Sequence, residues 1–292
     1  PTETVYGLAA NALSDDAILK VFKAKNRPSF DPLITHIKDQ KALTPLTTEI
    51  EESARRLIEQ FWPGPLTVVL QKSSKISDLI SSGLPTAAFR MPRHKLTRQL
   101  LNSLDFPLVA PSANPFGYVS PTRPEHVEAQ LGSKVDYILD GGICPVGIES
   151  TIIGFEENTP VILRLGGLAI EDIEKIVGPV KVNDYSSSNP KAPGMLENHY
   201  SPAKRVIIGD IKSLLNTDKN HKIGVLSYQE KYSDCTNFVL SEAGDLDEAA
   251  KRLFEGLRWL DTQDIDLIIS EYVPTHGLGR AINDRLNRAA AH

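Results

Sequence analysis

The chain has 292 residues, of which 41% are hydrophobic and 24% charged, a composition typical of globular proteins. Its net charge of −5 argues against a general nucleic-acid binder, whose binding face is usually strongly basic. No run approaches the roughly 20 apolar residues that span a bilayer. The two cysteines, Cys144 and Cys235, have neither metal-ligand spacing nor a disulfide framework, which favours a reducing, cytoplasmic environment.

The chain opens on Pro1 and runs directly into a motif. The opening has neither the charged region nor the apolar region of a signal peptide. We therefore expect that residues upstream of Pro1 are missing from this numbering.

Strand-like and helix-like segments alternate in the first 178 residues. A capped amphipathic helix is predicted from Ser14 to about Lys25, and capping-box patterns at 48–51 and 122–125 predict two more, ending at 61 and 132. Short apolar or β-branched runs predict the strands 66–71, 86–91, 108–110, 137–139, 152–155 and 161–165. This alternation indicates an α/β domain with a mixed sheet over residues 1–179.

Residues 180–204 have a linker composition, with SSSNP at 186–190 and a Pro-Gly turn at 193–194. Beyond them, strands are predicted at 205–208, 223–227 and 267–270, a helical stripe at 246–260 and a last helix at 281–291. The sequence thus predicts a second, small Rossmann-like parallel-sheet domain over 205–292. Because it lacks G-x-G-x-x-G, a dinucleotide site is not supported.

The first motif, PTETVYGL at 1–8, carries hydroxyls at alternating positions. In an extended segment Thr2, Thr4 and Tyr6 share one face, and hydroxyls suit a ligand that carries an amine, a hydroxyl and a carboxylate. The alternative is a strand whose hydroxyls meet only water.

Cations follow the first predicted helix. Lys25 and Arg27 could simply complement the helix dipole, or they could clamp a phosphate, with Arg27 as a bidentate fork. His36 lies in a strand-like run, where a lone histidine more often serves as a structural hydrogen-bonding group than as a catalyst.

Two arginines, Arg90 and Arg164, lie in apolar strands. A cation buried there needs an anion, which could be a ligand or a structural ion-pair partner. Ser112 and Asn114 follow a strand in a proline-bracketed turn, where ligands of open α/β sheets bind; the alternative is an ordinary Ser/Asn turn. The sequence has neither a Walker P-loop nor zinc-ligand spacing. We expect chemistry by positioning and charge stabilisation around two substrates.

In this order, the motifs resemble the threonylcarbamoyl-AMP synthase family (Sua5/YrdC/YwlC) in its long two-domain Sua5 form. The matching strings are PTETVYGL at 1–8, K-x-RP at 25–28 with PLI and His36 behind it, S-x-N at 112–114, STI at 150–152, PGM at 193–195 and HYSP at 199–202. The resemblance covers essentially the whole chain and implies a twisted YrdC-like mixed-sheet domain with an open cleft.

The resemblance also implies a reaction: L-threonine, bicarbonate or CO2 and ATP give threonylcarbamoyl-AMP and diphosphate. Mg²⁺ would accompany ATP as cofactor, and a separate tRNA threonylcarbamoyl transferase would use the adenylate to make N6-threonylcarbamoyladenosine at position 37. It implies neither stable nucleic-acid binding nor a membrane partner.

Carried over residue by residue, the resemblance assigns two sets of ligands and no metal ligand. L-Threonine would be held by Thr4, His36, Arg90, the Ala110 backbone and Ser150. ATP would be held by Lys25, Arg27, Asp31, Thr86, Ser112, Asn114, Ser120, Arg164 and Tyr200. Lys25 and Arg27 would act catalytically by neutralising phosphate charge, and Tyr200 in the linker would close over the nucleotide as part of a lid.

Two rivals are an RNA-binding module and a carbamoyl-transfer enzyme of hydrogenase maturation. The acidic net charge weighs against the first, and no aromatic-rich basic strand is present. The second also carries an acylphosphatase domain and zinc fingers, which this sequence lacks. The family normally has a strand and a helix ahead of the first motif, and this sequence does not contain them.

Overall fold

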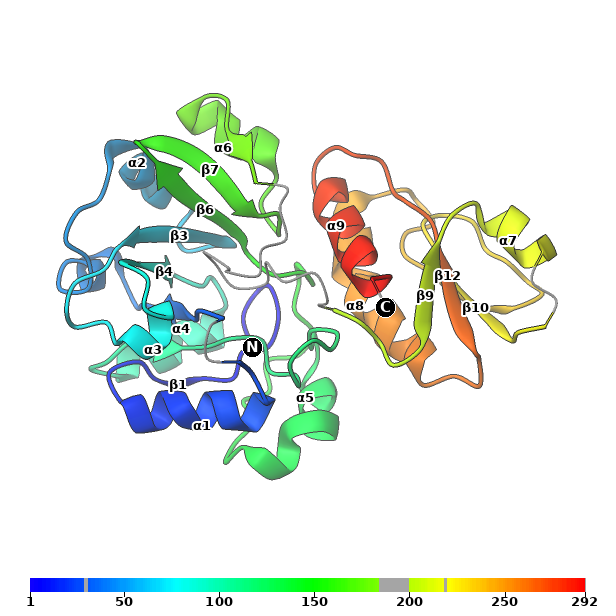
Figure 1. The fold of residues 1–292 in the computed structure, drawn as a ribbon, viewed down its shortest axis with the longest axis horizontal. Helices are drawn as coiled ribbons and strands as arrows, with labels where there is room; N and C mark the ends of the chain where they lie inside the picture. The colour runs from blue at the N-terminus through cyan, green and yellow to red at the C-terminus, as the bar shows by residue number, and fades with distance from the viewer. Residues whose placement is uncertain (29–30, 184–199, 218–219, 292) are drawn as a thin grey trace.

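The alternation of apolar runs and amphipathic helices produces two α/β domains in a computed structural model, which describes residues 1–28, 31–183, 200–217 and 220–291. An eight-stranded mixed sheet forms the first domain and a four-stranded parallel sheet the second. Figure 1 shows them side by side. The predicted α/β class and the division into a large mixed and a small parallel sheet are confirmed.

The large sheet has the strand order β1-β5-β2-β4-β3-β6-β7-β8. Its strands are β1 (Ala10–Asn11), β2 (Ile34–His36), β3 (Leu66–Gln71), β4 (Thr86–Arg90), β5 (Leu108–Val109), β6 (Thr151–Glu156), β7 (Thr159–Arg164) and β8 (Lys181–Val182). β2 runs parallel to β4, with His36 opposite Arg90. This register sets the two side chains that sequence analysis singled out beside each other at the carboxyl ends of both strands.

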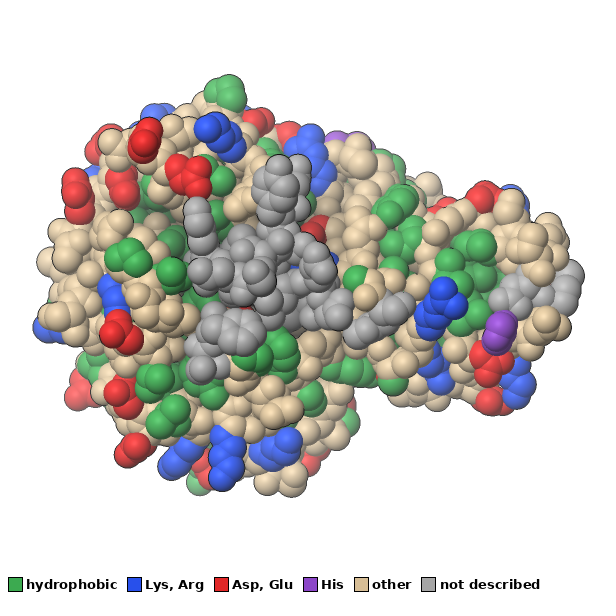
Figure 2. All heavy atoms as spheres, viewed as in Figure 1, with side chains coloured by type: hydrophobic (Ala, Val, Ile, Leu, Met, Phe, Trp, Pro, Cys, Tyr) green, Lys and Arg blue, Asp and Glu red, His purple; other side chains and the backbone are tan. Residues whose placement is uncertain are grey.

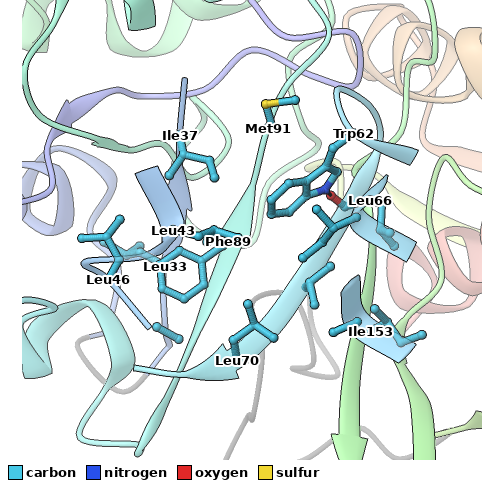
Figure 3. Close-up of a cluster of buried hydrophobic side chains, with 14 of the residues drawn as sticks. Leu33, Ile37, Leu43, Leu46, Trp62, Leu66, Leu70, Phe89, Met91 and Ile153 are labelled. Carbon is cyan, nitrogen blue, oxygen red and sulfur yellow. Dashed lines mark hydrogen bonds between the residues drawn. The ribbon is translucent and has the colours of Figure 1, made fainter. Parts of the chain in front are cut away.

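Helices cover this sheet and its edges. They are α1 (Asp15–Lys25), α2 (Glu52–Phe61), α3 (Asp78–Ser81), α4 (Lys95–Ser103), α5 (Pro124–Leu131) and α6 (Ile170–Val177), with the 3₁₀ helices η1 (Gln40–Leu43) and η2 (Gly132–Lys134). The predicted cap of α1 is confirmed, because Ser14 accepts a hydrogen bond from the Ala17 N–H. In the core of this domain, Phe89 and Leu33 pack with Trp62, whose indole N–H donates to the Leu66 carbonyl at 2.7 Å (Figure 3).

The small sheet has the order β11-β10-β12-β9, with every neighbouring pair parallel. The elements are β9 (Arg205–Ile208), α7 (Ile211–Thr217), β10 (Ile223–Ser227), β11 (Thr236–Val239), α8 (Leu246–Asp261), β12 (Leu267–Ser270) and α9 (Gly279–Ala289). The strands β9, β10 and β12 have the predicted bounds. The sequence analysis missed β11, whose half-buried edge position gives a weak apolar signal.

Three local predictions are wrong. Residues 137–139 form no strand, and Tyr137 is 94% exposed. Thr48 does not cap α2, because the helix begins only at Glu52 with Glu51 as N-cap, and the Thr48 N–H donates to the Gln71 carbonyl at the end of β3. The N-cap of α5 is Arg123 rather than the preceding threonine.

The second domain packs on the first through α8 and α9, while α7 lies on the far side of its sheet (Figure 1). One apolar cluster contains Val5, Val119 and Ile148 of the first domain together with Phe254 and Leu286 of the second. The two domains therefore share this apolar cluster.

Of the predicted linker, 180–204, the structure describes 180–183 and 200–204. The PGM motif at 193–195 and His199 lie outside the described residues, as do 29–30, 218–219 and 292. No helix in the described part of the chain is long and apolar enough to cross a membrane. On the face in Figure 2, acidic and basic side chains are interspersed along the rim of the first domain.

Candidate active site

A pocket opens at the carboxyl ends of β2 and β4, and its lining comes from the first domain and from Tyr200 of the linker. Among its lining residues are these members of the predicted site: Thr4, Arg27, His36, Arg90, Ala110, Ser112, Ser150, Arg164 and Tyr200. They come from widely separated stretches of sequence, so only the fold brings them together. The lining also includes Thr2, whose hydroxyl the motif pattern marks as a candidate for ligand binding, and Glu149, which sequence analysis did not assign to a ligand.

The first motif is a turn, so the prediction of an extended segment is wrong. Thr2 donates from its N–H and its hydroxyl to the Val5 carbonyl, and its hydroxyl lies 2.7 Å from that of Thr4. Tyr6 does not line the pocket, because its hydroxyl donates to the Gly142 carbonyl at 2.7 Å on another side of the motif. The turn directs Thr2 and Thr4, but not Tyr6, toward the pocket.

Arg90 is a buried cation at the end of β4 that has an ion-pair partner within the first domain. Its Nη2 lies 2.7 Å from Glu3 Oε1, and its Nη1 donates to the Thr4 hydroxyl at 2.9 Å. Burial alone raises the pKa of Glu3, but the charge and hydrogen bonds of Arg90 and the Arg93 N–H hold that pKa below its usual value. The guanidinium thus has an internal anion and also faces the pocket.

His36 is a neutral imidazole beside this ion pair. Burial, followed by the charge of Arg90, lowers its pKa to about 3. Its Nδ1 lies 3.3 Å from the Ile34 carbonyl. A base with this pKa is too weak to take protons near neutral pH, so the ring offers hydrogen bonds and shape instead.

The two cations after α1 have different surroundings. The Lys25 amine donates to the Ser112 and Asn114 carbonyls, both at 2.5 Å, and it does not belong to the pocket lining. Burial, reinforced by Arg27, places the pKa of Lys25 well below its usual range. Arg27 lines the pocket, pairs with Asp31 at 2.8 Å and donates to the Pro32 carbonyl at 2.8 Å. Lys25 therefore braces the S-x-N turn, while Arg27 reaches the pocket wall.

That turn lies against the first motif. Gly7 pairs with Ser112 in a single antiparallel bridge, and a Cβ at Gly7 would lie 3.1 Å from Ala110 Cβ, so a larger residue would push the two segments apart. The Asn114 amide donates to the Pro115 and Tyr118 carbonyls, both at 2.8 Å. Asn114 thus fixes the turn, and Ser112 lines the pocket.

The opposite wall is built around Ser150, which immediately precedes β6. Arg164 donates from Nε and Nη2 to the Ser150 carbonyl, at 3.1 and 2.8 Å, and from Nη2 to its hydroxyl at 3.1 Å. The Thr67 hydroxyl lies 2.7 Å from the Ser150 hydroxyl. Burial lowers the pKa of Arg164. Arg164 therefore holds Ser150 in place and adds a third cation to the pocket.

Tyr200 and Glu149 connect this wall to the second domain. The Tyr200 ring stacks on Phe254 of α8, with ring centroids 5.4 Å apart. Glu149 accepts from the Ser120 hydroxyl at 2.5 Å and pairs with Arg285 of α9 at 3.1 Å. Sequence analysis missed Glu149, and the only signal for it is its position beside Ser150, because its arginine partner lies 136 residues away.

Five predicted ATP ligands lie outside the pocket lining: Lys25, Asp31, Thr86, Asn114 and Ser120. Asp31 and Ser120 are held by Arg27 and Glu149, respectively. Thr86 is the first residue of β4 and Arg90 is the last, so the two lie at opposite ends of this strand. Their contacts with nucleotide stay predictions. Among the described residues, no three His, Cys, Asp or Glu side chains are grouped as metal ligands.

Comparison with known proteins identifies the family that shares this arrangement. Residues 1–166 match the Sua5/YciO/YrdC family model, described as "Telomere recombination", and residues 168–291 match the model "Threonylcarbamoyl-AMP synthase, C-terminal domain". The chain belongs to the Sua5 family. The resemblance inferred from the motifs is confirmed.

Two curated Sua5 relatives extend over the whole chain. Both are named threonylcarbamoyl-AMP synthase, a nucleotidyltransferase-type enzyme. The Pyrococcus abyssi protein is 41% identical, covering 100% of this chain and 89% of its own length. The Bacillus subtilis protein is 40% identical, covering 99% and 88%. The chain is therefore an enzyme of this family.

A solved structure supports the same relationship. The crystal structure of P. abyssi Sua5 complexed with L-threonine superimposes with a TM-score of 0.93 at 40% identity, covering 99% of this chain and 89% of that one. A variant of P. abyssi Sua5 with a histidine and the adjacent tyrosine replaced by alanine gives a TM-score of 0.91. Both Sua5 domains and their arrangement are thus common to this chain and the P. abyssi protein.

Proposed function

We propose that this Sua5 chain is an L-threonylcarbamoyladenylate synthase that prepares the adenylate for N6-threonylcarbamoyladenosine formation in tRNA. The observation that carries the proposal is the convergence of Arg27, Arg90 and Arg164 on one pocket that is also lined by hydroxyls. Three cations suit a ligand set with a carboxylate and a polyphosphate. The complex of the P. abyssi relative with L-threonine supports the part of the proposal that concerns the amino-acid substrate.

In the proposed reaction, the threonine amine combines with CO2, and the amine loses a proton as the N–C bond forms, giving a carbamate. When bicarbonate is the source, water also leaves. A carbamate oxygen attacks the α-phosphorus of ATP, and the bond from that phosphorus to the α,β-bridging oxygen breaks. The products are threonylcarbamoyl-AMP and diphosphate. Positioning of two substrates and stabilisation of phosphate charge are the contributions that this chemistry requires of the protein.

The threonine side of the pocket is the region around Arg90. Its guanidinium would bind the amino-acid carboxylate, and Thr4, neutral His36, the Ala110 backbone and Ser150 would bind the amine and hydroxyl. Arg90 already donates to Thr4, so this hydroxyl has a fixed orientation in the pocket. Because His36 is neutral, it adds no second positive charge that would compete for the carboxylate.

The nucleotide side is the region of Arg27, Ser112, Arg164 and Tyr200. Arg27 would neutralise phosphate charge directly, with Lys25 supporting the turn that carries Ser112. Mg²⁺ would enter with ATP, bound by the phosphates, whose charge it neutralises. A downstream tRNA threonylcarbamoyl transferase would consume the adenylate.

The test is mass spectrometry of the protein with ATP, L-threonine, bicarbonate and Mg²⁺, with diphosphate release followed in parallel. We expect a threonylcarbamoyl adenylate that disappears when threonine or bicarbonate is omitted. Turnover of carbamoyl phosphate with ATP in place of threonine would instead favour the carbamoyl-transfer reaction. Diphosphate release that ignores both threonine and bicarbonate would contradict the proposal.

A further inference from the structure

Arg285 of α9 is a fully buried cation in the second domain, with 0% of its side chain exposed. Its Nε and Nη2 lie 3.3 and 3.1 Å from Glu149 Oε2, and its Nη1 lies 2.8 Å from Asp284 Oδ2. Burial alone lowers the pKa of a guanidinium, but Tyr200, Glu149 and Asp284 outweigh it and raise the pKa of Arg285. The side chain is therefore charged, and it has two carboxylates to compensate its burial.

Arg285 does not line the pocket itself, but it contacts two residues that do. One is Glu149, and the other is Tyr200, whose ring centroid lies 5.0 Å from Arg285 Cζ. Tyr200 has a φ of +67°, a left-handed backbone conformation that is uncommon for residues other than glycine. Its ring packs against Phe254 and Arg285, both from the second domain.

The charge of Glu149 indicates what its ion pair with Arg285 does for the pocket. Among the described residues that line the pocket, Glu149 is the carboxylate beside three arginines, and its other oxygen accepts from Ser120 at 2.5 Å. A carboxylate facing this pocket without a partner would repel the phosphates of a nucleotide. Arg285 neutralises the charge of Glu149 from outside the pocket lining, so its guanidinium does not itself bind the ligand.

We propose that Arg285 is a positioning residue for ATP: through it, the second domain fixes Tyr200 and neutralises Glu149 on the nucleotide side of the pocket. This inference rests on the proposed function. It assigns to the second domain a direct part in substrate binding by the first.

Other ion pairs between the domains differ in their surroundings. Arg123 pairs with Glu255 at 2.6 Å and Arg280 with Glu171 at 3.3 Å, and the four side chains are 29–40% exposed. None of these four residues lines the pocket. Glu255→Gln is therefore a matched control, because it removes a charged contact between the domains without touching a pocket residue.

The test variant is Arg285→Lys, which keeps a positive charge but loses the planar fork that reaches Glu149 and Tyr200 together. We expect a roughly tenfold or larger rise in KM for ATP, the size of a lost hydrogen bond to a charged group, with KM for threonine within about twofold of wild type. Calorimetry with ATP alone should show the same weakening. Glu255→Gln should leave both KM values unchanged.

Wild-type enzyme is assayed first, so absence of adenylate there would refute the proposed function rather than the role of Arg285. Given an active wild type, equal rises in both KM values, or a lower folded fraction with unchanged KM values, would overturn the positioning role. Should Arg285→Lys fail to fold, Phe254→Leu decides, because it removes the ring stacking by which the second domain contacts Tyr200. An unchanged KM for ATP in that variant would equally overturn the proposal.

Discussion

Two buried arginine–glutamate pairs lie at the pocket, and they face it in opposite ways. Arg90 and Glu3 lie 2.7 Å apart within the first domain, and the arginine lines the pocket. Arg285 and Glu149 lie 3.1 Å apart across the two domains, and the glutamate lines the pocket. The same kind of ion pair thus places a cation in the pocket lining in the first case. In the second case the anion lines the pocket and the cation lies outside the lining.

The difference shows how one kind of ion pair can serve two purposes. In the first pair the internal carboxylate keeps a guanidinium charged and oriented in a buried position, ready for an anionic ligand. In the second pair the arginine keeps a carboxylate from repelling that ligand. The first pair should therefore mainly affect threonine binding, and the second pair should mainly affect nucleotide binding. Five predictions test this division, from the largest expected effect to the smallest.

Arg90→Ala should have the largest effect. It leaves Glu3 as an unpaired buried carboxylate, which costs about 3–5 kcal/mol of unfolding free energy. Urea unfolding at neutral pH measures this loss. In the protein that stays folded, threonine use should fall more than ATP use. A loss below about 1 kcal/mol would show that Glu3 does not depend on this partner.

Lowering the pH should destabilise the protein through His36, beside the first pair. Its folded-state pKa is about 3, below the usual value of 6.5, so between these values the unfolded chain binds more protons and stability falls as the pH falls. From about pH 6.5 to about pH 4 this contribution amounts to about 3 kcal/mol. Urea unfolding across this range measures it, and His36→Gln should flatten the slope. An equal slope in both proteins would assign the acid sensitivity elsewhere.

Arg27→Ala should weaken ATP use by about a hundredfold in kcat/KM, because it removes a cation that faces the proposed phosphates. Threonine use should change much less. Diphosphate release with each substrate varied in turn measures both effects. Arg90→Ala is the opposite case, so equal losses for both substrates in these two variants would refute the division of the pocket.

Ser112→Ala should have a smaller effect in the same direction. It removes one hydroxyl from the pocket, while Lys25 still holds the turn through backbone carbonyls. We expect a loss of about tenfold for ATP, the size of one hydrogen bond to a charged group, with thermal stability unchanged. The same kinetic assay serves, and an effect confined to threonine would contradict the placement of Ser112 on the nucleotide side.

Glu255→Gln should have the smallest effect. Its partner Arg123 and Glu255 itself are about one third exposed, and such pairs contribute less than about 1 kcal/mol. Urea unfolding should therefore nearly match wild type. A loss of several kcal/mol would mean that domain docking depends on this pair, and the contrast with the buried pair would disappear.

Local sequence signals predicted elements whose burial pattern is regular. β3, β9, β10 and β12 have the expected bounds because each is a predominantly apolar run. The sequence analysis missed β1 and β8, which have two residues each and exist only because a neighbouring strand pairs with them. It wrongly predicted a strand at 137–139 for the converse reason: the run is apolar, but it has no partner strand among the described residues.

The sequence by itself determined the family, the two-domain α/β plan and most of the residues that line the pocket, because these depend on motifs and on local periodicity. Tertiary structure alone decided what each charged side chain faces. It gave Arg90 an internal partner in Glu3, directed Lys25 at the S-x-N turn, and brought Arg285 from 136 residues away to Glu149. The physical reason is that electrostatic pairing in a low-dielectric interior depends on distance in space, which sequence separation does not encode.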